Sequence, residues 1–438
     1  MKKISTRALS VFLIAALVFT GMCVFIREEY LHGRKWAMYF SMFNPEADGQ
    51  LLDRNGIMLA AFNKDARVYA KDWPTRVSNY HVTGDYAGMT GTGVLNRFWG
   101  SASDYDFVYG IHNERSGSLS LGIDAELNNY AYSLLSQYGK GTVMIINYKT
   151  GEVICLVSSP SVDPAYPDEE PEDGAYVNRA LTATYTPGST FKLITSAAAI
   201  ENVPDLENMT FRCTGELDIA GISITCMEAH GTQTFEQALA NSCNCAFAYL
   251  TYMEVGQRLM VKYVTDYGFL SPHSIDGIFT SAGNYPTEFV GDPELAWSGI
   301  GQSTDQVCPF SMLRYVAAIA NGGTLAEPTF VKGGSNGKST LLVNPATASR
   351  LQELMRNNVV SHYAQEIPSF QDLPFCAKTG TAETGAGTSH SWFTGFLQDE
   401  AHPYAFVAVI EEGGFGLWAA GIMVNDIFQH MLQKAGTT

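Results

Sequence analysis

A long uninterrupted apolar segment near the N-terminus is the first feature of the hydropathy pattern. Residues 8–26 contain no charged side chain, and Lys2, Lys3 and Arg7 precede them. As a helix rising about 1.5 Å per residue, this segment spans roughly 28 Å, close to the hydrocarbon thickness of a bilayer. The positive flank favours a cytoplasmic N-terminus. The pattern therefore predicts that residues 1–26 are a short cytoplasmic tail and transmembrane anchor, with the rest of the chain outside the cell.

A cleaved signal peptide is the alternative for this segment. The apolar region of a signal peptide is usually shorter, about 7–15 residues, and ends at a cleavage site of small residues. No clear small-x-small site precedes Arg27. We therefore favour an uncleaved anchor.

Two pairs of apolar runs have the composition of β-hairpins. Residues 143–146 and 153–157 flank a turn at 148–151, and residues 390–397 and 404–410 flank a short polar segment. Runs of β-branched and aromatic residues bounded by such turns predict antiparallel strands.

Helical patterns occur before, between and after these strands. Residues 123–135 are amphipathic, and helices are also expected at 312–320 and near 423–432. Strands at residues 140–158 and 375–410 would form one antiparallel sheet with helices packed on it. The chain is therefore predicted to belong to the α+β class.

The stretch Thr186–Ile200 combines a helical pattern with candidate chemistry. Pro187 and Gly188 predict a turn that leads into an apolar, Ala-rich helix, with Ser189 at its start and Lys192 one turn on. Residues i and i+3 share a helix face, so the lysine amine can lie beside the serine hydroxyl. A buried lysine can take the proton of a serine nucleophile, and the N-terminal helix dipole stabilises negative charge nearby.

The amino-acid composition limits the classes of function that fit this chain. The chain has 438 residues, 46% hydrophobic and 16% charged, as expected of a globular protein with a large core. Its formal net charge of −17 argues against nucleic-acid binding, which favours basic surfaces. The eight cysteines are too few for a disulfide scaffold and form no C-x-x-C zinc pair, so no metal site and no cofactor are expected.

Two further motifs follow the S-x-x-K sequence in order along the chain. Ser242-Cys-Asn244 is an S-x-N sequence, and Lys378-Thr379-Gly380 is a K-T-G sequence. Single copies of such motifs are weak signals. A second S-x-x-K at 335–338 lies in a Gly-rich turn, and a second K-T-G at 149–151 is a hairpin turn. Three motifs in order, each in a fitting structural context, point to one active site.

The order S-x-x-K, S-x-N, K-T-G resembles that of penicillin-binding proteins and related β-lactamases. Upstream, Asp53–Gly56 and Leu59-Ala60 are similar to a motif near the start of the extracellular part of class B penicillin-binding proteins. The Arg-Gly that usually precedes this motif is missing, and Asp48-Gly49 stands there instead. The chain thus resembles a class B enzyme of the division or elongation type.

The resemblance implies a penicillin-binding transpeptidase fold, an antiparallel five-stranded sheet with helices on both sides. This domain would occupy residues 118–438, after a small mixed pedestal domain without catalytic residues at 27–117. The pedestal is too short for the glycosyltransferase domain of class A enzymes, so a separate multi-pass membrane glycan polymerase is the implied partner. Gly299–Gln302 resembles the family's Gly-Gln-Gly segment, with Ser303 in place of the last glycine.

The resemblance also implies a peptidoglycan D,D-transpeptidase, which cross-links stem peptides ending in D-Ala-D-Ala and is acylated by β-lactams. Ser189 would attack the carbonyl of the penultimate D-Ala and form an acyl-enzyme. Lys192 would accept the proton, although the identity of the acylation base is disputed in this superfamily. Ser242 would relay the proton to the departing amine, and Asn244 would hold Lys192 and the substrate amide.

The third motif would bind the substrate. Lys378 would bring positive charge toward the terminal carboxylate, with the hydroxyls of Thr379 and Thr381 as hydrogen-bond donors. Gly380 would keep the strand open so that a substrate backbone can lie along it. The backbone N–H groups of Ser189 and Thr381 would form the oxyanion hole, each worth about 3 kcal/mol.

Two other classes of function remain open. One is a hydrolase, either a D,D-carboxypeptidase or a β-lactamase, and the other is a non-catalytic β-lactam sensor or wall-peptide scaffold. A hydrolase needs a base that activates water, and Glu383 is the one carboxylate beside the three motifs. It is expected to point toward the rim of the cleft. The complete set of motif residues argues against a non-catalytic scaffold.

Along the chain, two cysteines and a histidine lie shortly before the second motif, and two further cysteines flank its asparagine. Cys213 and Cys226 are predicted to flank one short hairpin, and outside the cell they would either form a disulfide across its arms or remain as two buried thiols. Cys243 and Cys245 stand on either side of the motif asparagine and are interpreted as packing residues that do not bond to each other. His230, next to a glycine, is interpreted as a structural hydrogen-bonding residue.

Overall fold

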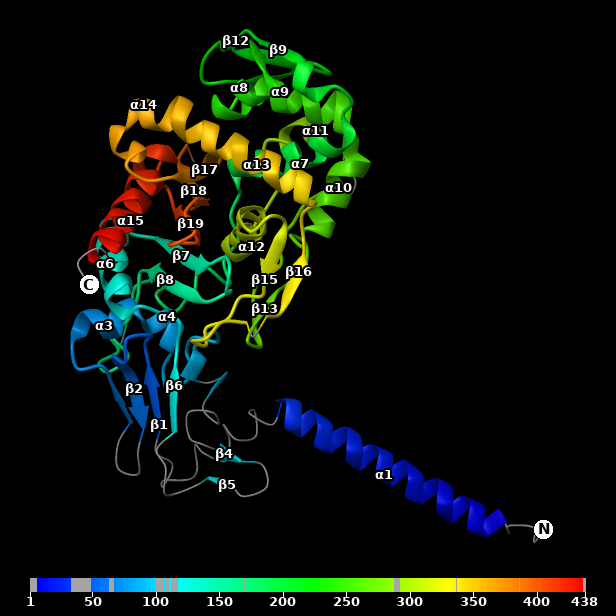
Figure 1. The fold of residues 1–438 in the computed structure, drawn as a ribbon, viewed down its shortest axis with the longest axis vertical. Helices are drawn as coiled ribbons and strands as arrows, with labels where there is room; N and C mark the ends of the chain where they lie inside the picture. The colour runs from blue at the N-terminus through cyan, green and yellow to red at the C-terminus, as the bar shows by residue number, and fades with distance from the viewer. Residues whose placement is uncertain are drawn as a thin grey trace.

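The computed structural model describes residues 6–32, 49–62, 67–95, 97–98, 105–106, 110–111, 117–168, 170–286, 292–335, 337–385 and 387–435. Figure 1 shows a large part built of helices and strands above a smaller, strand-rich part, with the N-terminal helix extending away from both.

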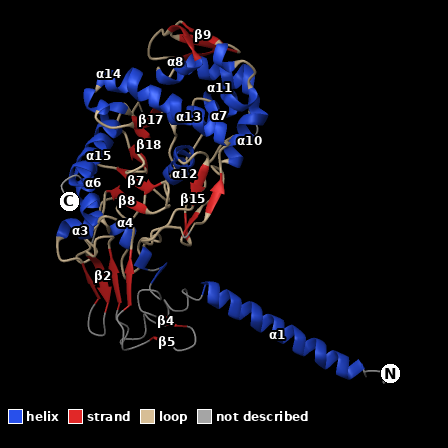
Figure 2. Cartoon of the chain, in the orientation of Figure 1, coloured by secondary structure: helices blue, strands red, loops and turns tan. Residues whose placement is uncertain are grey.

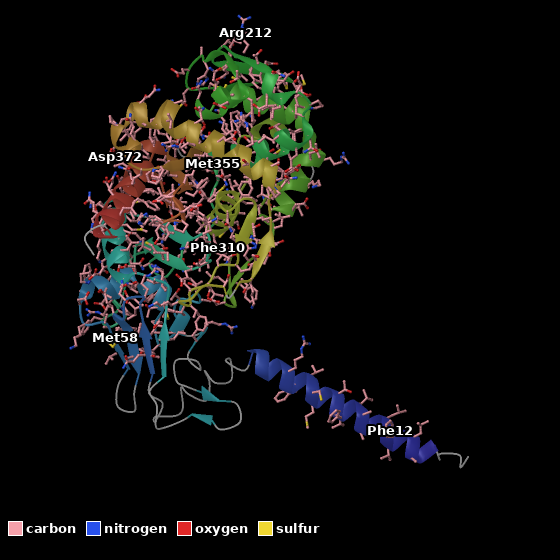
Figure 3. All side chains as sticks on the ribbon, viewed as in Figure 1. Phe12, Met58, Arg212, Phe310, Met355 and Asp372 are labelled. Carbon is pink, nitrogen blue, oxygen red and sulfur yellow. The ribbon has the colours of Figure 1, made fainter. Side chains whose placement is uncertain are left out.

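The N-terminal helix α1 spans Thr6–His32. Its segment Ala8–Phe25 is long and apolar enough to cross a membrane, and none of it is buried by the rest of the described chain. Figure 3 shows Phe12 and its neighbours projecting from this helix into open space. The predicted apolar helix is confirmed, and it fits a membrane anchor.

A four-stranded sheet forms the smaller part, in the order β3-β2-β1-β6. Its strands are β1 (Gly49–Leu52), β2 (Met58–Phe62), β3 (Arg67–Tyr69) and β6 (Gly117–Ser120). β1 and β2 form a hairpin at Asn55-Gly56, a pair of residues typical of tight hairpin turns, because glycine adopts the positive φ of +86° that the turn needs. β6 pairs parallel to β1 and crosses the expected boundary between residues 117 and 118, so the division into domains stays a prediction.

Short elements surround this sheet. They are α3 (Trp73–Ser78), α4 (Tyr80–Thr83) and the two-stranded pair β4 (Tyr105–Asp106) and β5 (Gly110–Ile111). Asp72 caps α3 by accepting a hydrogen bond from the backbone N–H of Thr75. Arg76 of α3 donates to both carboxylate oxygens of Asp163, at 2.8 and 2.7 Å, so an ion pair joins this helix to the larger part.

The predicted five-stranded antiparallel sheet is confirmed, with the order β17-β18-β19-β7-β8. Its strands are β7 (Gly141–Asn147), β8 (Val153–Ser159), β17 (Phe375–Glu383), β18 (Ser389–Leu397) and β19 (Tyr404–Ile410). The N-terminal hairpin and the C-terminal strands meet where β19 pairs with β7. β17, which carries the K-T-G motif, is one of the two edge strands, and β8 is the other.

Helices cover both faces of this sheet, as Figure 2 shows. Alternate residues of β19 enter two different hydrophobic clusters, as the period of a strand requires. The first cluster includes α7 (Lys192–Asn202), α12 (Pro309–Ala320) and α13 (Pro345–Asn358), and the second includes α6 (Ala125–Leu135) and α15 (Ile422–Ala435). The helices expected at 123–135, 312–320 and 423–432 are thus present, with ends shifted by a few residues.

The rest of the larger part consists of short elements. The helices are η2 (Gly188–Phe191), η3 (Leu206–Asn208), α8 (Phe235–Ala240), α9 (Asn244–Tyr249), η4 (Leu250–Val255), α10 (Gly256–Asp266), α11 (Asp292–Ser298), η5 (Val359–Tyr363), α14 (Ala364–Glu366), η6 (Pro368–Gln371), η7 (Leu417–Gly421) and η1 (Ser136–Tyr138). The strands are β9 (Thr210–Cys213), β10 (Glu216–Ile219), β11 (Ile222–Thr225), β12 (Gly231–Thr234), β13 (Ser274–Ile275), β14 (Ile278–Phe279), β15 (Thr324–Ala326) and β16 (Ser339–Leu341).

The short hairpin predicted between Cys213 and Cys226 is present, but neither cysteine lies on its two strands. β10 pairs with β11 in a hairpin that lies between Cys213 and Cys226, whereas β9 pairs with β12 further along the chain. Both cysteines are free thiols, so the unpaired alternative describes the structure. The pairing of β9 with β12 depends on contacts that the local pattern does not reveal. This small region lies at the top of the molecule in Figure 1.

Candidate active site

The segment that carries Ser189 forms a tight turn before its helix. Gly188–Phe191 is a 3-10 turn, and the α-helix begins at Lys192 rather than at Ser189 as predicted. Gly188 has a φ of +53°, and a Cβ there would lie 2.8 Å from the carbonyl oxygen of Thr381. Only glycine fits this close approach, which brings the turn at Gly188–Phe191 against β17.

Lys192 joins the first two motifs. Its Nζ donates to Ser189 Oγ at 2.9 Å, to the carbonyl oxygen of Ser242 at 2.7 Å and to Asn244 Oδ1 at 2.7 Å. The side chain is completely buried, and this burial lowers the pKa of Lys192 to about 8. An amine with such a pKa can lose its proton near neutral pH and accept one from the adjacent hydroxyl.

The S-x-N motif forms the turn between α8 and α9. Ser242 has a φ of +53°, in the left-handed region that non-glycine residues adopt at a cost of about 1–3 kcal/mol. The side chain of Asn244 donates from Nδ2 to the carbonyl oxygen of Thr225 at 2.9 Å, while its Oδ1 accepts from Lys192. β11 and Lys192 therefore fix both ends of the amide group.

Lys378 lies on β17 with its side chain buried. Its Nζ donates to Ser242 Oγ at 3.0 Å and to the carbonyl oxygen of Thr379 at 3.2 Å. Burial lowers the pKa of Lys378, and the charge of Lys192 lowers it further. Ser242 Oγ is also 3.3 Å from the amine of Lys192, so it lies between the two amines and can pass a proton from one to the other.

The rest of the third motif packs against the turn that carries Ser189. A Cβ on Gly380 would lie 2.8 Å from the carbonyl oxygen of Pro187, so this glycine permits the turn to approach β17. The expected role of this glycine in leaving the strand open to a substrate stays a prediction. Thr379 donates its N–H to the hydroxyl of Tyr363 at 3.1 Å, and Thr381 Oγ1 accepts from the N–H of Gly416 at 3.2 Å. Tyr363 and Gly416 carried no signal in the sequence.

These groups border a cleft of about 690 Å³. The lining includes Ser189, Ser242, Asn244, Thr379 and Thr381, whereas both lysines lie behind it. Exposed aromatic and apolar side chains also line the cleft: Met227, Phe415 and Trp418. The arrangement exposes the hydroxyl of Ser189 to the cleft and keeps the Lys192 amine that contacts it out of solvent.

The remaining candidates have different surroundings. Glu383 lines the cleft and is exposed, in line with the expected position at its rim. Ser335 donates its hydroxyl hydrogen to the carbonyl oxygen of Lys338 at 3.1 Å, and Lys338 is exposed. Since no buried amine faces Ser335 in the described structure, the second S-x-x-K sequence is a surface turn. Gln302 lines the cleft, and the carbonyl oxygen of Gly301 accepts the N–H of Gly188 at 2.9 Å.

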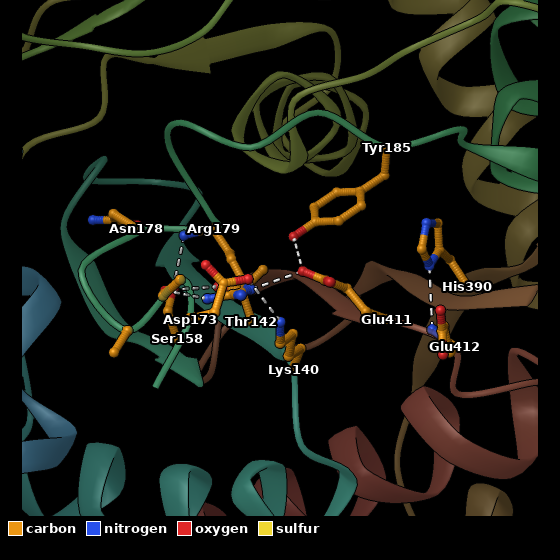
Figure 4. A network of polar contacts seen from close by, with 12 residues as sticks. Lys140, Thr142, Ser158, Asp173, Asn178, Arg179, Tyr185, His390, Glu411 and Glu412 are labelled. Atoms are coloured by element: carbon orange, nitrogen blue, oxygen red, sulfur yellow. Dashed lines mark hydrogen bonds and ion pairs between the residues drawn. The ribbon is translucent and has the colours of Figure 1, made fainter. Parts of the chain in front are cut away.

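A polar network that the sequence analysis missed holds the segment leading to Ser189. Figure 4 shows Tyr185 and Arg179 converging on Glu411, whose Oε1 accepts both hydrogen bonds at 2.8 Å. Trp392 Nε1 also donates to the carbonyl oxygen of Thr186 at 3.0 Å. The network ties the segment before Ser189 to the sheet. The residues that form these hydrogen bonds are more than two hundred positions apart in the sequence, so no local pattern could have revealed them.

Removal of the Glu411 charge is expected to destabilise the protein. The Arg179 side chain is only 4% exposed, so Glu411→Gln would leave a buried guanidinium without its counter-ion. The expected loss is about 3 kcal/mol of unfolding free energy. Denaturant unfolding of the full chain in detergent measures it, with Glu412→Gln, an exposed neighbour, as the control. Equal stability of the two variants would contradict this role.

Comparison with known families gives one family match. The Penicillin binding protein transpeptidase domain matches residues 141–429, more than half of the chain. The matched stretch contains all three motifs of the cleft.

Individual proteins are similar over different lengths. Stage V sporulation protein D of Bacillus subtilis is 37% identical over 197 residues, which span 43% of this chain and 29% of that protein. Peptidoglycan D,D-transpeptidase PbpA of Mycobacterium tuberculosis is 29% identical over 361 residues, or 72% of this chain and 71% of that protein.

Solved structures share the fold. Penicillin-binding protein A from M. tuberculosis, in a penicillin G acyl-enzyme complex, superposes with a TM-score of 0.72 and 23% identity. The superposition covers 88% of this chain and 99% of that one.

Proposed function

The chain belongs to the family with a penicillin-binding protein transpeptidase domain, and on this premise we propose that it is a serine-type peptidoglycan D,D-transpeptidase. The observation that carries the proposal is the 2.9 Å hydrogen bond between the buried Lys192 amine and Ser189 Oγ at the edge of the cleft. It joins a nucleophile to a base, and the sequence relatives named peptidoglycan D,D-transpeptidase support the substrate class.

Acylation begins with attack of Ser189 Oγ on the carbonyl of the penultimate D-Ala, while Lys192 takes the hydroxyl proton. The backbone N–H groups of Ser189 and Thr381 are assigned to the oxyanion. The bond between this carbonyl and the terminal D-Ala nitrogen then breaks, and the proton passes through Ser242 to the departing amine. The products are free D-Ala and an ester between Ser189 and the shortened stem peptide.

In the second half of the reaction, the acyl group on Ser189 is transferred to an amine. The amine of a neighbouring stem peptide attacks the ester carbonyl, a proton returns to Ser189 through Lys192, and a new amide bond forms. Asn244 is assigned to the substrate amide and the hydroxyls of Thr379 and Thr381 to its carboxylate. Lys378, which is buried behind Ser242, contributes its positive charge to the carboxylate site from there.

Transfer to an amine is expected to exceed hydrolysis, because the described structure has no carboxylate hydrogen-bonded to Ser189, Lys192 or Ser242. Without such a base, water is poorly activated against the acyl-enzyme. The test gives the full chain in detergent a thioester analogue of the stem peptide, with and without a D-amino acid acceptor. The expected products are mostly transfer products at about millimolar acceptor.

The same assay separates the alternatives. Dominant hydrolysis at that acceptor concentration would favour the D,D-carboxypeptidase or β-lactamase class. Binding without any turnover would favour a sensor or scaffold. The variant Glu383→Gln serves as the matched control, because removal of this rim carboxylate should leave the ratio of transfer to hydrolysis unchanged.

The proposal extends to location and partner. The anchor α1 would span the cell membrane once with its N-terminus in the cytoplasm, which places the cleft outside the cell near nascent glycan. Stem peptides must be joined to glycan strands that another enzyme makes, so a multi-pass membrane polymerase is the proposed partner. Protease protection of the N-terminus in sealed vesicles tests the orientation.

A further inference from the structure

Three cysteines and a histidine from separate elements converge beside the S-x-N turn. Cys213 ends β9, Cys226 follows β11, His230 precedes β12, and Cys243 lies between α8 and α9. One ligand atom from each residue lies within 4.8 Å of the other three. No two of these residues form a C-x-x-C pair, so the sequence alone predicted no metal site here.

The spacing of these atoms suits a tetrahedral ion. Cys213 Sγ is 3.4 Å from His230 Nδ1, and Cys226 Sγ is 3.7 Å from Cys243 Sγ. Zinc bonds of about 2.3 Å to sulfur and about 2.0 Å to nitrogen place tetrahedral ligands roughly 3.5–3.8 Å apart. Both of these separations are close to those that a bound Zn²⁺ requires, and all four ligand atoms lie within 4.8 Å of one another.

The surroundings of the ligands are those of a metal-thiolate site. The sulfur of Cys226 accepts the backbone N–H groups of Asn244 at 3.1 Å and Cys245 at 3.3 Å, which stabilise a thiolate. The His230 side chain is 8% exposed, and its outer nitrogen Nε2 faces a carboxylate oxygen of Glu228 at 3.9 Å. A carboxylate on the second nitrogen is common for metal-bound histidine, because it fixes the ring orientation.

We propose that Cys213, Cys226, His230 and Cys243 bind one Zn²⁺ ion as a structural site closed by four protein ligands. A set of three cysteines and one histidine is a recurrent zinc ligand set. Since the four side chains fill the coordination sphere, the ion takes no part in the acyl transfer. The site goes beyond the proposed function, and its occupancy does not depend on that function.

The ion would position the second motif. Cys243 stands between Ser242 and Asn244, and Cys226 follows Thr225, whose carbonyl oxygen accepts from the side chain of Asn244. Zinc bonds to both cysteines would therefore hold the strained turn at Ser242 against the end of β11. This gives the cluster a role in placing Ser242 and Asn244 around Lys192.

A disulfide is the competing chemistry for the same sulfurs. Cys226 Sγ lies 3.7 Å from Cys243 Sγ and 3.4 Å from Cys245 Sγ, and oxidising conditions outside the cell favour a bond. Zinc-bound thiolates remain reduced, so the two states differ both in metal content and in the number of titratable thiols.

The test measures metal in the full chain, purified in detergent without a metal-binding tag. Elemental analysis should find about one Zn²⁺ per chain, which a mercurial reagent releases as it titrates the thiols. Cys226→Ser should lose most of the metal. His230→Cys should retain it, because four cysteines also bind zinc, and Cys155→Ala, a buried thiol of the main sheet, should retain it too.

Several outcomes would overturn the proposal. One is a wild-type chain that binds no zinc even after incubation with Zn²⁺ and reductant. Another is a wild-type chain that is purified without metal and contains a Cys226–Cys243 or Cys226–Cys245 disulfide. The third is an unchanged zinc content in Cys226→Ser. The wild-type measurement stands even if a variant fails to fold. As a second readout, removal of the ion from the wild-type chain should slow penicillin acylation on the order of tenfold or more. Full acylation speed without zinc would overturn the positioning role.

Discussion

Replacement of Ser189 by alanine is expected to abolish the covalent penicillin adduct and to leave the fold intact. A β-lactam carbonyl presents the same electrophile as the D-Ala-D-Ala carbonyl, so it should acylate the same oxygen. Ser189 Oγ accepts a hydrogen bond from the buried Lys192 amine and lines the cleft. Removal of a nucleophile typically lowers the rate by at least about a thousandfold. Mass spectrometry of the full chain with labelled penicillin, followed by peptide mapping, measures the adduct.

The second S-x-x-K sequence supplies the control. Ser335 lies in a turn and donates to a backbone carbonyl oxygen, so Ser335→Ala should retain the complete adduct. An adduct mapped to Ser335, or no adduct on any serine of the wild-type chain, would refute the assignment of the nucleophile. Unchanged thermal unfolding of Ser189→Ala would show that the loss is chemical.

Replacement of Lys192 by arginine is expected to slow acylation by about 10²–10⁴-fold, the usual contribution of a general base. Arginine keeps the positive charge, but it does not give up its proton in proteins. The variant therefore shows whether acylation needs only the positive charge at residue 192 or also a group that can accept a proton. Its matched control is Lys338→Arg, at the exposed lysine of the surface turn, which should acylate at the wild-type rate.

The pH profile gives this prediction a second readout. Burial lowers the pKa of Lys192 to about 8 from its usual value near 10.5. The neutral amine is the base, and it predominates above its pKa, so the wild-type acylation rate should rise with pH through about 8. The arginine variant should lack this rise. A wild-type rate that is independent of pH between about 6 and 9 would argue that another group takes the proton.

Much of the fold and of the site could be predicted because it rests on local rules. Ser189 and Lys192 are three residues apart at the start of a predicted helix, and a helical backbone places two such residues on one face. The Asn55-Gly56 turn and the hairpins of the main sheet follow from turn chemistry and apolar alternation. The helix over the apolar segment 8–26 also follows from local composition, since the segment is long, apolar and free of charged residues.

The local pattern did not reveal contacts between distant segments. The hairpin between Cys213 and Cys226 formed as β10 and β11, but Cys213 lies on β9, which pairs with β12, because a strand takes whichever edge the fold brings alongside it. The contact of Gly380 with Pro187 was also unpredicted, because it depends on how the turn at Ser189 packs on β17.

The three motifs, their order and the kind of elements that carry them follow from the sequence, since these depend on neighbours within a few residues. The burial of the Lys378 amine against Ser242 and the ion pair of Glu411 with Arg179 became apparent from the three-dimensional fold. The fold also brings Cys213, Cys226, His230 and Cys243 into one cluster. Hydrogen bonds and metal ligands act over a few ångströms, and a sequence does not specify which distant residues folding brings within that range.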